Sequence, residues 1–135
     1  MDAPPDGRTR AFWWPMRGQS MAPALLPGDE ILLAPWDRAP APGDIVLARV
    51  QGSFVVHRVV WAGPTRLVTR GDGCIRADPP VPRSAVPYRV AAVRRSGVEQ
   101  PPPPPQLADA VRRGRRRDAW VRAVRGVLGL ERPAE

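Results

Sequence analysis

The chain contains no lysine, because all 21 of its basic residues are arginine, and it has one histidine, His57, and one cysteine, Cys74. These counts exclude a disulfide within the chain and a cluster of Cys and His ligands with structural-zinc spacing, so we expect no metal and no cofactor. No stretch approaches the roughly 20 apolar residues of a transmembrane helix, and residues 1–10 lack the apolar segment of a signal peptide. The sequence therefore predicts a cytoplasmic or peripheral membrane protein.

A length of 135 residues, 43% of them hydrophobic, predicts one domain with a modest core and polar tails. We expect a disordered N-terminus over residues 1–10, a folded domain over 11–98, a polyproline linker over 99–106 and a basic helical tail over 107–135. The formal net charge is +8. Arginines are denser in the tail, which indicates either an anionic partner there or simply a soluble tail.

Short apolar runs bounded by turn signals predict a mainly β fold, a small antiparallel sheet or partial barrel. Asp29 and Asp44 each end a Pro-Gly-Asp triplet, and we expect their carboxylates to close these turns by bonding the backbone. Residues 11–16, "AFWWPM", favour a strand or an exposed apolar loop. The expected strands lie within residues 27–34, 42–49, 52–63, 65–74 and 88–95.

Five consecutive prolines, residues 101–105, cannot join a helix or a sheet ladder and predict a stiff polyproline II spacer. Beyond them, Trp120, Val124, Val127 and Leu128 recur at helical spacing among arginines, the pattern of a basic amphipathic helix. Its apolar face could dock on the domain's own core or lie on a membrane surface. Nucleic acid is the least favoured of the three partners.

Ser20 lies in "RGQSMAPALLPGDE", and a serine hydroxyl is a poor nucleophile unless a base is aimed at it. The absence of lysine excludes a Ser-Lys dyad, and arginine stays protonated. His57 is the only side chain whose ordinary titration range lies near neutral pH. The alternative is that a lone histidine in an apolar strand is a core or surface residue.

Four ordered motifs resemble those of the signal peptidase I family and its LexA-type relatives, which are serine peptidases. The first is "GQSMAPALLPGD", and "PGDIV", "VVHRVV" and "TRGDGCIRAD" follow it in the family's order. The resemblance covers about residues 12–95. Because "VVHRVV" places a histidine where other branches carry a lysine base, the chain is most similar to the archaeal and endoplasmic-reticulum branch.

This resemblance implies that Ser20 is the nucleophile and His57 the general base. It also implies that Asp78, six residues after Asp72, orients the imidazole and stabilises its protonated form. Asp72 is then interpreted as a turn and hydrogen-bonding residue. We expect the backbone N–H of Ser20 to contribute to an oxyanion hole.

Three further residues of the first motif, Gly18, Met21 and Pro23, are expected to shape the substrate-binding cleft and the turn behind the serine. Simple packing is the alternative for Met21 and Pro23. Cys74 is a rival nucleophile on chemical grounds, but it occupies a position where the family usually has asparagine, and a catalytic role is not favoured.

The leading hypothesis is a serine endopeptidase that cleaves an extended leader-like or signal-like peptide, with a peptide or protein as its partner. A second hypothesis is a non-catalytic module of the same fold whose basic tail binds a membrane surface or nucleic acid. Self-cleavage of the LexA kind ranks last, since no Ala-Gly pair precedes Ser20. The oligomeric state does not follow from the sequence.

Overall fold

The computed structural model describes residues 10–105, which form one antiparallel sheet of eight strands and a single 3-10 turn, η1 (Arg83–Ala85). The strands are β1 (Phe12–Pro15), β2 (Glu30–Ala34), β3 (Ile45–Val50), β4 (Ser53–Ala62), β5 (Arg66–Arg70), β6 (Val81–Pro82), β7 (Tyr88–Arg95) and β8 (Val98–Gln100). The predicted mainly β fold is confirmed. The predicted N-terminal disorder, except at residue 10, and the predicted C-terminal helix lie outside the described residues.

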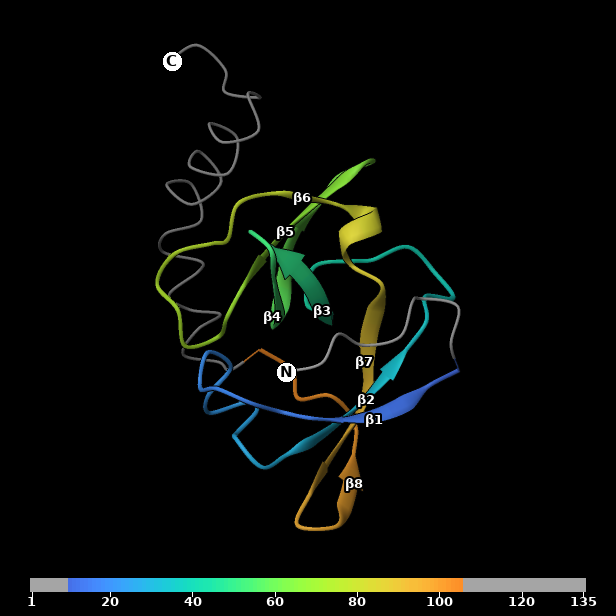
Figure 1. The fold of residues 1–135 in the computed structure, drawn as a ribbon, viewed down its shortest axis with the longest axis vertical. Coiled ribbons are helices and arrows are strands. Elements are labelled where there is room, and N and C mark those ends of the chain that lie inside the picture. The colour runs from blue at the N-terminus through green and yellow to red at the C-terminus, as the bar shows by residue number, and fades with distance from the viewer. Residues whose placement is uncertain (1–9, 106–135) are drawn as a thin grey trace.

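The strand order is β1-β2-β7-β3-β4-β5-β6, with β8 added to the far end of β7. Strand β7 pairs with β2 between Arg89 and Arg94 and with β3 at Tyr88 and Arg89, so β7 joins the two halves of the sheet. Figure 1 shows this arrangement: β7 runs between an upper group, β3 to β6, and a lower group, β1, β2 and β8. Each half then has a core of its own.

Strand β3 separates the two hydrophobic cores because its side chains alternate between its faces. Ile45 and Leu47 pack in the first core, with Tyr88 of β7, whereas Val46 and Ala48 pack in the second. All four are buried, which explains why β3 is continuously apolar over these four residues rather than alternating with polar ones.

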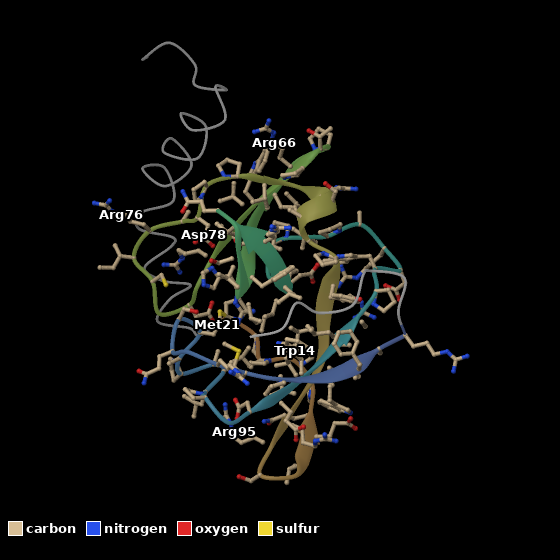
Figure 2. All side chains as sticks on the ribbon, viewed as in Figure 1. Trp14, Met21, Arg66, Arg76, Asp78 and Arg95 are labelled. Carbon is tan, nitrogen blue, oxygen red and sulfur yellow. The ribbon has the colours of Figure 1, made fainter. Side chains whose placement is uncertain are left out.

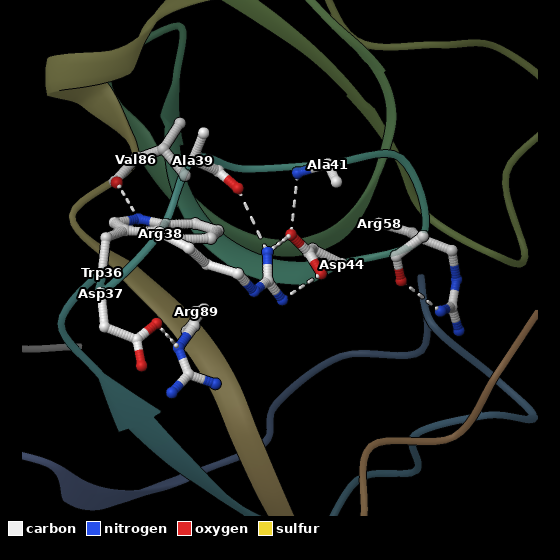
Figure 3. Close-up of polar contacts among 10 residues, drawn as sticks. Trp36, Asp37, Arg38, Ala39, Ala41, Asp44, Arg58, Val86 and Arg89 are labelled. Atoms are coloured by element: carbon white, nitrogen blue, oxygen red, sulfur yellow. Dashed lines mark hydrogen bonds and ion pairs between the residues drawn. The ribbon is translucent and has the colours of Figure 1, made fainter.

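Both Pro-Gly-Asp turns are closed by their aspartates as predicted. The Leu26 N–H donates to Asp29 Oδ2 over 2.8 Å, and the Ala41 N–H donates to Asp44 Oδ2 over 2.9 Å. The guanidinium of Arg38 also donates to both oxygens of Asp44, in the loop between β2 and β3 that Figure 3 shows. These bonds satisfy backbone donors that the turns would otherwise leave free.

Two features at the C-terminal end of the described chain differ from the expected domain and linker boundaries. Strand β8 runs to Gln100, which pairs with Val93 inside the stretch expected as linker. The carbonyl of Pro103 accepts a hydrogen bond of 3.1 Å from Arg58 Nη2 on β4. Within residues 10–105, no helix is long and apolar enough to cross a membrane.

Candidate active site

Ser20 begins a tight turn, Ser20–Ala24, in the loop between β1 and β2. The Leu25 N–H donates to the Met21 carbonyl over 3.0 Å, which closes one helical turn directly after the serine. The side chains of Met21 and Leu25 are fully buried in the first core. They fix the turn from inside and leave Ser20 half-buried at the surface.

His57 lies on β4 opposite Val46 of β3, and it is 6% exposed. Its Nε2 atom lies 3.1 Å from Ser20 Oγ, although the two residues are 37 positions apart in sequence. A separation of 3.1 Å is within the range for a hydrogen bond between a serine and a base. The structure therefore brings the predicted nucleophile and the predicted base together.

Asp78 Oδ2 lies 2.5 Å from Nδ1, the other ring nitrogen of His57. A carboxylate accepts hydrogen bonds, so this contact favours the tautomer with its proton on Nδ1, in which the lone pair of Nε2 faces Ser20. Figure 2 places Asp78 on the inner side of the loop after β5, while Arg76 projects outward from it. The three predicted residues thus form a continuous chain of hydrogen bonds.

The loop that follows β5 packs directly against the serine turn. The Gly73 N–H donates to the Ser20 carbonyl over 2.8 Å, and the Cys74 N–H donates to the Gly71 carbonyl over 2.9 Å. A Cβ atom on Gly71 would lie 2.5 Å from the Ser20 carbonyl oxygen and 3.1 Å from His57 Nε2. No larger residue fits at position 71 without displacing the backbone of the serine.

Arg58 and Asp72 form a buried ion pair beneath this loop. Arg58 Nε and Nη2 donate to the two oxygens of Asp72 over 2.9 and 2.8 Å, and both side chains are at most 3% exposed. The remaining bonds of the guanidinium go to the Gly43 and Pro103 carbonyls. A bidentate pair of this kind holds Asp72, and with it the loop, in one position.

The other residues singled out by sequence lie near the serine in different environments. Gly18 is exposed and has φ of 75°, a left-handed conformation that favours glycine, and Pro23 is exposed. Met21 has no exposed surface, and its sulfur accepts the Asp72 N–H over 3.3 Å, so it acts on the turn from inside. Cys74 Sγ lies 4.0 Å from the Ser20 carbonyl oxygen and, within residues 10–105, makes no hydrogen bond to the imidazole.

Sequence reasoning did not identify two polar residues that support the site, Thr69 and the ion-pair partner Arg58. Both are almost completely buried, at 0% and 1% exposure. The available signal was a polar side chain next to buried apolar residues of a strand, since buried polar groups require partners. In the part of the chain that the structure describes, no three His, Cys, Asp or Glu side chains gather closely enough to hold a metal ion.

Residues 3–69 match the family model described as Peptidase S24-like. The matched range contains Ser20 and His57 and ends before Asp78. No curated protein and no solved structure matches the chain significantly. The match relates the chain to the S24/LexA-like superfamily of peptidases.

Proposed function

We propose that this chain, which is related to the S24/LexA-like peptidases, is a serine endopeptidase of the signal peptidase I type. Its catalytic residues would be Ser20, His57 and Asp78. The observation that carries this proposal is the hydrogen-bonded chain from Ser20 Oγ through both ring nitrogens of His57 to Asp78. A buried imidazole held between a hydroxyl and a carboxylate is the arrangement that activates a serine nucleophile.

The first half of the reaction is acylation. His57 Nε2 accepts the proton of Ser20 Oγ as the oxygen attacks the scissile carbonyl, and the Asp78 carboxylate stabilises the imidazolium that forms. The oxyanion of the tetrahedral intermediate accepts a hydrogen bond from the Ser20 N–H. The imidazolium then gives its proton to the leaving amine, the C–N bond breaks, and an ester on Ser20 remains.

The second half of the reaction repeats these roles with water as the nucleophile. His57 takes a proton from the water as its oxygen attacks the ester carbonyl, and returns a proton to Ser20 Oγ as the C–O bond breaks. The free carboxylic acid leaves and the enzyme is restored. No cofactor is required by this sequence of steps.

The substrate we propose is an extended peptide, such as a leader or signal-like segment with small residues at its cleavage site. The ladder between β4 and β5 stops at the Arg58–Arg70 pair. Within residues 10–105, the stretch Ser53–His57 of β4 therefore has a ladder partner only in β3. An extended peptide can add to such an open edge by backbone hydrogen bonds, and this edge ends at the proposed base.

The test uses a fluorophosphonate probe, which acylates activated serines and requires no knowledge of the natural substrate. We expect the wild-type protein to be labelled at Ser20, and the variants Ser20→Ala and His57→Ala to lose labelling at this position. Ser84→Ala is the matched control, because Ser84 is exposed on η1 and outside the site, and it should label like the wild type.

Labelling of the His57→Ala variant at the wild-type rate would end the proposal. A wild-type protein that is folded but never labelled at Ser20 would also contradict it. That second result would favour the non-catalytic binding module. Peptide cleavage that persists in Ser20→Ala would point to another nucleophile, with Cys74 the first to examine.

A further inference from the structure

Thr69 carries a fully buried hydroxyl on β5, and this hydroxyl donates to the carboxylate of Asp78. Its side chain is 0% exposed on β5, where it follows the buried residues Leu67 and Val68. Thr69 Oγ1 donates to Asp78 Oδ2 over 2.7 Å. This is the same oxygen atom that lies 2.5 Å from His57 Nδ1. One carboxylate oxygen is therefore shared between the imidazole and the threonine.

A second hydrogen bond ties the backbone of the same two residues together. The Asp78 N–H donates to the Thr69 carbonyl over 2.8 Å. The chain thus leaves β5 after Arg70, passes through the Gly71–Gly73 turn beside Ser20, and returns to Thr69 at Asp78. The backbone bond fixes where Asp78 lies, and the hydroxyl bond restricts the rotation of its carboxylate.

The register of the sheet explains why Thr69 can reach this carboxylate. Thr69 lies directly opposite Val59 of β4, two residues beyond His57. Because alternate residues share one face of a strand, the side chains of His57, Val59 and Thr69 lie on the same face of the sheet. The threonine is therefore a diagonal neighbour of the imidazole, with Asp78 between them.

We propose that Thr69 is a positioning residue of the site: its hydroxyl holds Asp78 Oδ2 in line with His57 Nδ1 and so keeps Nε2 unprotonated toward Ser20. An aspartate side chain that accepts only the imidazole N–H is free to rotate about its last torsion, which is broad in energy. A second donor on the same oxygen removes this freedom. This inference rests on the proposed peptidase function and adds a residue to it.

Packing alone does not account for a threonine at this position. Valine has nearly the same shape, favours strands, and has no hydroxyl that must be satisfied when it is buried. A buried hydroxyl at this position is explained if its hydrogen bond holds the acceptor group in one orientation. A carboxylate aimed at a catalytic imidazole is such an acceptor, because a small error in its direction changes the proton position on the ring.

The first measurement compares rates of fluorophosphonate labelling at Ser20. We expect Thr69→Val to label about tenfold more slowly than the wild type, the effect of losing one hydrogen bond to a charged group. Thr69→Ser keeps the hydroxyl and should restore most of the rate. Thr65→Val is the matched control, because it makes the same substitution at an exposed threonine in the β4–β5 turn and should leave the rate unchanged.

The second measurement is the tautomer of the imidazole, read from ¹⁵N chemical shifts at neutral pH. His57 is the only histidine in the chain, so its two ring nitrogens are assigned without ambiguity. The wild type should carry its proton on Nδ1. Thr69→Val should increase the share of molecules protonated on Nε2, and Thr69→Ser should reverse this change. A substitution that affects only packing would not move the tautomer.

The outcomes separate this inference from the proposed function. If the wild type is not labelled at Ser20, the peptidase proposal fails. If the wild type is labelled but Thr69→Val matches it in both rate and tautomer, the role of Thr69 fails alone. Should Thr69→Val not fold, Thr69→Ala provides the second hydroxyl-free variant. In the wild type, a Thr69 hydroxyl proton that exchanges rapidly with water would overturn the inference without any variant.

Discussion

Replacing Asp72 by alanine should destabilise the fold severely, because Arg58 would keep its charge in a buried position without a counter-ion. The guanidinium is 1% exposed and makes two of its bonds to Asp72, over 2.8 and 2.9 Å. Breaking a buried pair by removing one partner costs about 3–5 kcal/mol. A domain of about 100 residues has a total stability of roughly 5–15 kcal/mol. The variant should therefore lose a large fraction of its stability.

The assay is equilibrium unfolding in urea followed by tryptophan fluorescence. A double-mutant cycle with Arg58→Met and Asp72→Leu measures how much of the lost stability comes from leaving a buried charge unpaired. Removing both charges leaves no unpaired ion, so the double variant should be more stable than Asp72→Leu alone. The reasoning is refuted if Asp72→Ala costs less than about 1 kcal/mol, or if the double variant is as unstable as the two single losses added together.

Three further predictions concern the site and its supports. Gly71→Ala should reduce labelling of Ser20 by about a hundredfold or more, because the new Cβ would lie 2.5 Å from the Ser20 carbonyl oxygen. Gly73→Ala, whose new Cβ has its nearest contact at 3.2 Å, should reduce the labelling rate much less. Equal labelling rates for the two variants would contradict this argument. Labelling should also fall as the pH is lowered, since a protonated imidazole has no lone pair for the serine, and a flat pH profile would argue against His57 as base. Finally, hydrogen bonds from Arg95 hold the pKa of Asp29 below its usual value of 3.8, so this contact stabilises the fold above that pH and is lost as the pH falls through the lower, folded-state pKa. The stability difference between wild type and Asp29→Asn in urea should shrink at acid pH, and a difference that grows instead would reverse the sign of this argument.

Much of the sheet could be predicted because its local signals agree with its tertiary structure. The Pro-Gly-Asp turns before β2 and β3 specify where each strand begins, and their aspartates bond the backbone as expected. The short strands β6 and β8 were missed. Neither has a clear apolar pattern. Strand β6 forms by pairing with β5, and β8 forms by pairing with the end of β7. Such pairing is a property of the folded chain.

The candidate site also contains residues that could be predicted from the sequence and residues that could not. Elimination of other bases led to His57, and the resemblance to a known family pointed to Asp78, so the sequence could place both beside Ser20. Thr69 and the Arg58–Asp72 pair could not be found in this manner, because a polar side chain within a strand does not reveal which distant residue it bonds. Their partners lie 9 and 14 residues away in sequence and become neighbours only when β4, β5 and the following loop assemble.

The contact between Arg58 and the Pro103 carbonyl has a consequence for any shortened form of the protein. Truncation before the five prolines would keep every strand of residues 10–105, since the prolines follow β8. A chain ending at Gln100 would remove one acceptor from a guanidinium that is 1% exposed, and would let water approach the residue adjacent to His57. A shortened form that keeps this contact must therefore include Pro103.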